Sequence, residues 1–492
     1  MKKIYFFLIA ITWHFSCFSQ HITAQLIDKN NGRSIPYASI KTGVYKGVIS
    51  NEEGYFTIYS ENNNIKSVTI SCLGYLNKTI SIDDIIAFNY IIKLEEAVHK
   101  LNAVYLSNKP PNADSIIAKV KAHTPINYKS ELNHYAIFRR TTDYIDFKSL
   151  EFEIEKASHI KKHQLEAANK SLNALSNKIK NSDIKEFADL KGELYVLDKD
   201  SSKLEVEKAT KLLDHKNDFS MEEVQDKAQN LVLEYLDTTK TYKLKTGLFK
   251  IEDSLALNKG DFKDEHNKNE YKTASLNKKL RSFLKRAQYY DNSFLFKLLD
   301  FEYYNFKYQN MTYDNNELTY IIHFTPKKSK AKYTGKIYVN QNTYAITRLD
   351  YAFYKNRHGD KLNLKFLLGI KFNENMSEGT LLFKKDSNNM YHPKYLKRTN
   401  GSYFYVNRDV KFIENTHAKK KVNFSFKLEG DARNKEELLF ISSNELTLDD
   451  FNSIKQDSIV TFSVLSTFDK TLWEKEETLE PSTEMKTFST TD

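Results

Sequence analysis

Four short segments, ITAQLID (residues 22–28), NGRSIPYASI (31–40), VISNEEGYFTI (48–58) and VTISCLGY (68–75), decide the fold of the first part of the chain. Apolar and polar residues alternate in each segment, and Gly or Asn residues stand between them as they do in turns. Alternation of this kind buries one face of each strand, and several such strands in succession are typical of two packed sheets. The sequence therefore predicts a small β-sandwich.

Three features of this stretch carry a family resemblance: Gly32 followed by IPYA (35–38), the turn and strand SNEEGYF (50–56), and the ending SCLGY (71–75). Together they resemble the carboxypeptidase regulatory-like domain, a transthyretin-type sandwich, over residues 22–94. The resemblance implies an accessory module of secreted enzymes, outer-membrane receptors and uncharacterised envelope proteins of Gram-negative bacteria. Such a module carries no catalytic residues of its own.

An export signal precedes the sandwich. Lys2 and Lys3 stand before an apolar run over residues 4–13, which is too short to span a bilayer. We expect cleavage after residue 19 and export to the periplasm or to an outer-membrane-associated position. In the alternative, Cys17 carries a lipoprotein anchor, although His14 stands where such a site normally has an aliphatic residue.

The remaining chain has the composition of a second, larger domain. We predict a signal peptide over 1–19, the sandwich over 20–95, a linker over 96–114, a helix-rich part over 115–292, a sheet over 293–468 and a disordered tail over 469–492. Helices are expected over 115–122 (ended by Pro125), 159–182, from Ser220 onward and over 274–289. The second of these has an apolar stripe of Leu165, Leu172, Leu175 and Ile179.

Segments rich in aromatic and β-branched residues follow, separated by Asn, Asp and Gly. Strands are expected at 135–141, 150–154, 303–308, 318–324, 333–339, 344–353, 362–372, 380–383 and 422–426. Consecutive hairpins with one apolar face predict one large antiparallel sheet covered by the amphipathic helices. The expected fold class is thus mainly β with an α+β second domain.

A second resemblance rests on KYTGKIYVN (332–340) followed by TYAI (343–346). This strand-turn-strand signature resembles envelope proteins of unknown function that accompany the regulatory-like domain. Those proteins are in turn similar to the periplasmic lipoprotein-carrier fold, in which a curved sheet folds around helices and encloses a groove for acyl chains.

Charge and cysteine content exclude some classes of function. The net charge of +10 comes mainly from Lys residues scattered among nearly as many acids, whereas nucleic-acid binders concentrate Arg, so we expect no nucleic-acid partner. Without the signal peptide Cys72 has no partner for a disulfide, and its strand position predicts a buried, inert thiol.

The common catalytic and metal-binding motifs are absent. The chain has no His-Glu-x-x-His, Gly-x-Ser-x-Gly or phosphate-binding Gly-rich loop. His163 and Glu166 have the spacing of a zinc carboxypeptidase motif, with His159 one turn before them, but Lys161 and Lys162 would repel a divalent ion. We interpret these residues as solvated and predict no catalytic, cofactor or metal site.

Two smaller patterns leave alternatives open. Asp28, Asn30 and Asn31 have the character of calcium ligands, but Ser39 stands where a calcium loop needs Glu, so a plain turn is favoured. Aromatic residues cluster in two strands, where they either line a groove for acyl chains, carbohydrate or a peptide or pack the sheet: Tyr303, Tyr304, Phe306, Tyr308, Tyr403, Phe404 and Tyr405.

The leading prediction is a non-enzymatic exported envelope protein. Its sandwich serves as a docking or spacer module, and its larger domain binds an envelope protein partner or an apolar ligand, in peripheral association with the outer membrane. One alternative is a periplasmic lipid or lipoprotein carrier. Another is a secreted hydrolase, which the company of the regulatory-like domain and the His163 to Glu166 spacing suggest.

Overall fold

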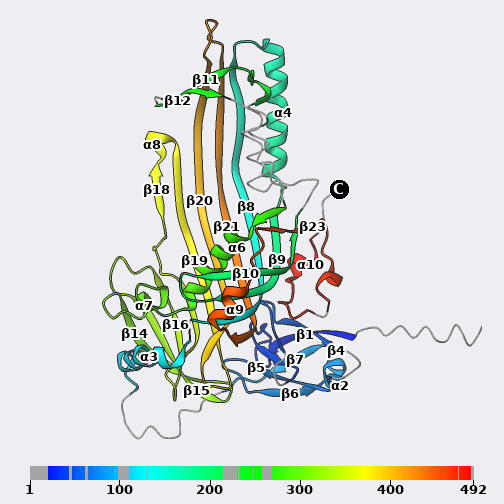
Figure 1. The fold of residues 1–492 in the computed structure, drawn as a ribbon, viewed down its shortest axis with the longest axis vertical. Helices are drawn as coiled ribbons and strands as arrows, with labels where there is room; N and C mark the ends of the chain where they lie inside the picture. Colours follow the sequence, from blue (N-terminus) through cyan, green and yellow to red (C-terminus); the bar gives the residue numbers. More distant parts are fainter. Residues whose placement is uncertain are drawn as a thin grey trace, which may run out of the picture. The chain divides into compact units, whose positions relative to one another are not determined.

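The computed structural model describes residues 20–43, 47–60, 65–97, 110–129, 131–213, 230, 233–247, 249–256, 269–474 and 476–488 (Figure 1). The expected signal peptide with Cys17, and almost all of the helix expected from Ser220, lie outside these residues. Within them no helix combines the length and apolar character needed to cross a bilayer. The chain forms two compact units: residues 1–106 with 311–319 and 469–486, and residues 107–310 with 320–468 and 487–492.

The first unit contains a β-sandwich, as predicted. One sheet has the order β4 (Tyr55–Ser60), β1 (Gln20–Asp28), β7 (Ile91–Leu94), and the other β3 (Gly47–Ile49), β2 (Ser39–Lys41), β5 (Ser67–Ser71), β6 (Lys78–Ser81). Leu26 and Phe56 of the first sheet and Ile40 and Ile70 of the second are fully buried in one core. Helix α2 (Ile82–Ala87) follows β6, and the Cys72 side chain is buried, as predicted.

The C-terminal segment differs from the expected disordered tail. It forms a 3₁₀-helix, η3 (Lys470–Trp473), and a short helix, α10 (Thr483–Lys486), with Trp473 and Met485 buried. The backbone N–H and hydroxyl of Thr483 donate to the Glu53 carboxylate at 3.0 and 2.7 Å. These bonds tie the segment to the turn before β4, which a composition rich in Glu, Ser and Thr did not indicate.

The second unit is built on one large sheet of antiparallel strands (Figure 1). Its order is β14-β15-β16-β17-β19-β20-β21-β8-β9-β10-β23, with β18 paired to β19 and β11 to both β12 and β20. The last pair in this order, β10 and β23, is parallel. The three longest strands lie side by side: β8 (Asn133–Ala157), β20 (Tyr391–Glu414) and β21 (Lys421–Glu445). The other strands are β9 (Ile184–Val196), β10 (Ser202–Leu212), β11 (Thr241–Thr246), β12 (Phe249–Ala256), β14 (Tyr304–Asp314), β15 (Glu317–Pro326), β16 (Tyr333–Asn340), β17 (Ile346–Phe353), β18 (Lys361–Leu364), β19 (Ile370–Lys385) and β23 (Ser463–Leu465). A separate pair joins β13 (Glu270–Lys272) to β22 (Ile459–Thr461).

Helices cover one face of this sheet in two places, which confirms the expected fold class. Helices α3 (Ala113–Asn127), α6 (Thr273–Leu284) and α7 (Phe294–Leu298) contribute to one core. Helix α4 (Lys162–Lys180) packs on β8 and contributes to a second core, with Leu172 and Ile179 of the predicted stripe buried. Short helices α8 (Lys365–Leu368) and α9 (Leu448–Ser453) and the 3₁₀ turn η2 (Lys285–Ala287) complete the unit.

Three boundaries differ from the prediction. Asn112 caps α3, and the helix, which was expected to end at residue 122 before Pro125, continues through Pro125 for two more residues. The two strands expected at 135–141 and 150–154 are parts of the single strand β8. The strand expected at 362–372 is divided by α8, because Gly369 takes a left-handed conformation (φ 61°) that ends the helix and turns the chain into β19.

Candidate apolar binding face

Pairing at the edge of the sheet sets two rows of apolar residues on one face. Leu362 of β18 pairs with Phe372 of β19, which pairs with Phe404 of β20. Leu364, Ile370 and Val406 form the next row. Directly paired residues of antiparallel strands point to the same side, so these six side chains form one continuous surface, which we name the apolar edge.

The apolar edge continues inward to the core beneath α4. Phe404 pairs with Gly430 of β21, which pairs with Phe147 of β8, and the Phe404 and Phe147 rings meet edge to face at 5.9 Å. A Cβ added at Gly430 would lie 2.8 Å from Cζ of Phe404, so the ring occupies the space that a side chain would take. Phe147 is buried, whereas Phe404 is partly exposed. The apolar side chains on this face therefore become more exposed to solvent from β8 toward β18.

Helix α4 covers the β8 end of this face. Its Leu172 and Ile179 belong to one core with Phe152 and Ile154 of β8. The Asn169 side chain also binds the β8 backbone twice, because it accepts from the Ile154 N–H at 2.9 Å and donates to the Ile154 carbonyl at 3.0 Å. These bonds lie where β8 and β21 shift register, and they fix the helix at that point of the strand.

The β18 end of the face is open. Leu362 is 45% exposed and Phe372 is 38% exposed. Phe366 and Leu367 of α8, between these two strands, are fully exposed and 69% exposed. Large apolar side chains that are contiguous and exposed mark sites of interaction with ligands, proteins or membranes.

The opposite face of the same strands is polar. Lys371 pairs with Tyr405 and its ammonium lies 5.1 Å from the centre of the Tyr403 ring. The Tyr403 hydroxyl donates to Glu429 at 2.7 Å, and burial together with this acceptor raises the pKa of Tyr403 to about 12. Lys148 forms an ion pair with Asp431 at 2.5 Å. The sheet thus separates an apolar face from a polar one.

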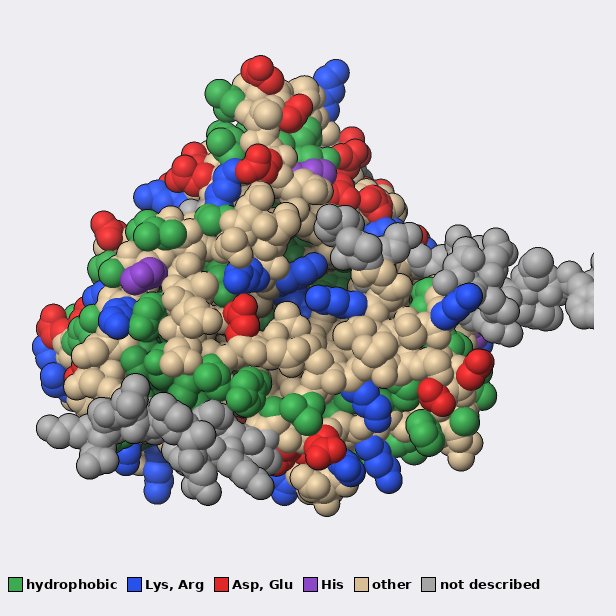
Figure 2. Space-filling model, turned by 90° about the horizontal axis from the view of Figure 1, so that it is seen from below, with side chains coloured by type: hydrophobic (Ala, Val, Ile, Leu, Met, Phe, Trp, Pro, Cys, Tyr) green, Lys and Arg blue, Asp and Glu red, His purple; other side chains and the backbone are tan. Residues whose placement is uncertain are grey.

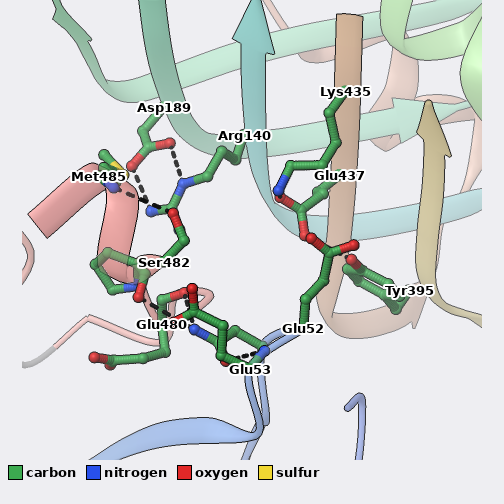
Figure 3. A network of polar contacts seen from close by, with 12 residues as sticks. Glu52, Glu53, Arg140, Asp189, Tyr395, Lys435, Glu437, Glu480, Ser482 and Met485 are labelled. Atoms are coloured by element: carbon green, nitrogen blue, oxygen red, sulfur yellow. Dashed lines mark hydrogen bonds and ion pairs between the residues drawn. The ribbon is translucent and has the colours of Figure 1, made fainter. Parts of the chain in front are cut away.

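Several buried polar and ionisable side chains of the sheet pair with one another. Arg140 and Asp189 form a bidentate pair at 2.7 and 2.8 Å, and the Tyr395 hydroxyl donates to Glu437 at 2.7 Å (Figure 3). Burial lowers the pKa of Lys397, opposite Glu437 in the pairing, to about 8. We interpret these pairs as structural, since they join neighbouring strands of the sheet. The expectation that the chain has no catalytic site stays a prediction.

The sequence motifs singled out for metal chemistry fall in separate places. His163 and Glu166 lie on the exposed side of α4, where Glu166 has Lys162 as a neighbour at 3.9 Å. In the first unit, Oδ1 of Asp28 accepts the backbone N–H groups of Asn30 and Asn31 at 2.7 and 3.0 Å. That arrangement is the turn favoured from the sequence. Among the described residues no group of three or more His, Cys, Asp or Glu side chains is placed to hold a metal ion.

The two aromatic clusters do not line one groove. Tyr304 is buried edge-on against Phe324, and Tyr308 meets Tyr320 in the same way, so the β14 cluster packs the sheet. The β20 cluster is divided between the two faces, because Phe404 belongs to the apolar edge whereas Tyr403 and Tyr405 lie on the polar face. This division follows from the alternation of side chains along β20.

Lys and Arg side chains are interspersed with acidic and apolar ones over the face shown in Figure 2. This distribution agrees with the scattered charge of the sequence.

One family model matches part of this chain. Residues 299–437 match a family of unknown function (DUF5686), and this range includes the KYTGKIYVN segment. A search of curated proteins gave no match.

Two solved structures illustrate the distant likenesses. A putative outer membrane lipoprotein-sorting protein domain from Vibrio parahaemolyticus is 11% identical, with 69% of this chain and 96% of that chain covered and a TM-score of 0.21. A chain of the Pseudomonas aeruginosa MucA/MucB complex is 8% identical, with 72% of this chain and 100% of that chain covered and a TM-score of 0.15. Likenesses at these TM-scores support no argument about this chain.

Proposed function

We propose that this chain is an exported, non-enzymatic envelope protein that binds an apolar ligand, such as an acyl chain, on the apolar edge. The observation that carries the proposal is the partial exposure of Leu362 and Phe372, at 45% and 38%, on a sheet face that is otherwise core. Removal of apolar surface from water is favourable by about 25 cal/mol per Å², so a ligand that covers these side chains gains affinity without displacing any part of the fold.

The geometry suits an elongated ligand. The two rows of the apolar edge run across three neighbouring strands, and the partly exposed Phe404 lies where they approach the α4-covered core. Strands in a sheet are about 4.8 Å apart, so the rows extend over roughly 10 Å. That length matches a segment of an acyl chain or an apolar side of an extended peptide.

The sandwich has a separate role in this proposal, as a docking or spacer module. Its resemblance to the carboxypeptidase regulatory-like domain and its two-sheet core support that role. The predicted signal peptide supports placement in the periplasm or at the outer membrane. The second resemblance favours a more specific function, in which the chain carries lipid or lipoprotein. Native mass spectrometry of the gently purified chain tests this function, because a carrier should co-purify with lipid.

Binding of a fluorescent palmitate analogue, followed by fluorescence anisotropy, tests the proposal directly. Each of the substitutions Leu362→Ser and Phe372→Ser removes part of a large apolar side chain, and we expect the pair to weaken binding by about tenfold or more. Lys371→Ser is the matched control, because Lys371 is the next residue on the same strand and points to the polar face. Equal affinity of the double variant and the unaltered chain would contradict the proposal.

A further inference from the structure

The turn between β18 and β19 extends the apolar surface beyond the sheet itself. The segment KLNLKFLLGIKF (361–372) contains α8, whose Phe366 is fully exposed and whose Leu367 is 69% exposed. We define Phe366 and Leu367 as the apolar tip. Burial of a Phe or Leu side chain is favourable, and the folded chain leaves both of these side chains exposed to water.

Backbone contacts hold the tip in place. The Gly369 N–H donates to the Lys365 carbonyl at 3.0 Å, and the Asn407 N–H of β20 donates to the Gly369 carbonyl at 2.8 Å. A Cβ at Gly369 would lie 2.0 Å from the Asn407 carbonyl oxygen, so only glycine fits this approach. Because the turn is anchored on both sides, the exposure of Phe366 and Leu367 follows from the fold.

The charges around the tip identify the surface that it fits. Residues 361–372 include Lys361, Lys365 and Lys371 and no carboxylate. The Lys365 ammonium lies 4.2 Å from the centre of the Tyr405 ring, on the polar face and away from the apolar edge. The Arg408 side chain lies against the turn at Gly369, and the acidic residues that flank these segments in the chain are Asp360, Glu374 and Asp409.

We propose that the apolar tip inserts into the surface of a lipid bilayer that contains anionic lipids, with the surrounding lysines at the level of the headgroups. Aromatic and aliphatic residues buried at the acyl boundary and cations beside anionic headgroups are the two terms that hold peripheral proteins on membranes. A protein partner would cover such residues with a shaped pocket and needs no excess of cations. The inference is independent of ligand binding on the apolar edge, since it uses α8 and the lysines.

Co-sedimentation of the purified chain with vesicles tests the inference. Vesicles of phosphatidylethanolamine with 30% phosphatidylglycerol serve as the anionic surface and phosphatidylcholine vesicles as the neutral one. We expect binding to the anionic vesicles that is severalfold weaker in 500 mM than in 50 mM salt, because screening removes the lysine contribution. The variant carrying Phe366→Ser and Leu367→Ser is expected to lose about tenfold or more in partition coefficient.

Leu448→Ser is the matched control. Leu448 of α9 is 54% exposed and belongs to the same unit, and its replacement should leave vesicle binding unchanged. Thermal unfolding of all variants should be alike, because the substituted side chains are exposed.

Three outcomes would overturn the inference. The first is absence of binding of the unaltered chain to either vesicle. The second is equal binding by the tip variant. The third is a concentration-dependent dimer that the tip substitutions abolish, which would assign the tip to a second copy of the chain. Palmitate binding retained by the tip variant separates this inference from the proposed function.

Discussion

Replacement of Gly369 by Ala tests whether the turn at α8 is fixed as strictly as its geometry indicates. A non-glycine residue at φ 61° costs about 1–2 kcal/mol. The added Cβ would lie 2.0 Å from the Asn407 carbonyl oxygen, so the two backbones must separate by more than 1 Å to reach ordinary contact. Loss of the hydrogen bond from the Asn407 N–H adds about 0.5–1.5 kcal/mol, which brings the total to roughly 1.5–3.5 kcal/mol.

Gly247 provides a matched control for the conformational part of this cost. It has φ 56° and an added Cβ would meet nothing within 4 Å, so Gly247→Ala should cost only about 1–2 kcal/mol. Urea unfolding gives the two differences in free energy, and hydrogen exchange at the Asn407 amide reports the local opening. We expect faster exchange at Asn407 in Gly369→Ala alone. If the two variants lose equal free energy of unfolding and exchange equally at Asn407, the close approach of Gly369 to β20 adds no cost beyond the conformational one, and the reasoning is wrong.

Three further predictions concern the cores and the turns. Ile179→Ala should destabilise the second unit by about 2–5 kcal/mol in urea unfolding, because Ile179 is buried beneath α4, whereas exposed Lys178→Ala should change it by less than 0.5 kcal/mol. Hydrogen bonds from the Asn31 and Asn30 amides lower the pKa of Asp28, so this carboxylate stabilises the first unit above pH 4 and the effect is lost as the pH falls through the folded-state pKa; Asp28→Asn should flatten that acid limb in pH-dependent thermal unfolding. Trp473→Ala should lower the free energy of unfolding of the first unit, measured by calorimetry, by about 3–5 kcal/mol, because Trp473 is buried. An unchanged free energy of unfolding would contradict the packing of Trp473 and support a disordered C-terminal segment.

The elements that were predicted well from the sequence are those whose apolar residues recur with one clear spacing, either helical or alternating. Helix α4 has its apolar residues at helical spacing against a lysine-rich side, and the structure buries Leu172 and Ile179 of that stripe. In β15, alternating residues identified a strand, and Ile322 and Phe324 are fully buried. The sandwich was predictable for the same reason, since glycine and asparagine turns divide its alternating segments.

The longest strands lacked that signal. The middle of β20 carries Lys397 and Arg398 side by side, and β21 carries Glu436 and Glu437 opposite them, so charges stand on both faces. Their partners come from strands far away in the chain, as with Arg139, whose guanidinium lies 2.8 Å from Glu436. A local sequence pattern does not show which distant residues pair in the sheet. For this reason only the short apolar end of β21 was predicted.

The exposure of the apolar edge could not be predicted from the sequence either. The residues that form it read as an ordinary buried strand, because exposure of Leu362 and Phe372 depends on whether another element covers them. Similarly, Trp473 and Met485 stand alone among Glu, Thr and Ser, a density too low to indicate burial. Their contacts come from the tertiary structure of the first unit.

For the proposed binding of an apolar ligand, the free-energy cost differs between the helix-covered part of the sheet and the apolar edge. Where α3 and α6 cover the sheet, Ile117, Leu280, Phe283 and Leu284 are at most 1% exposed. An acyl chain could enter there only if the helices moved and exposed these four residues, at about 1.5–3 kcal/mol each and therefore roughly 6–12 kcal/mol in all. That cost would offset most of the affinity of a micromolar ligand, whose binding free energy is about 8 kcal/mol. On the apolar edge the same ligand covers side chains that are already exposed, so no part of the core has to open, and binding at the edge is favoured over an enclosed groove of the lipoprotein-carrier type.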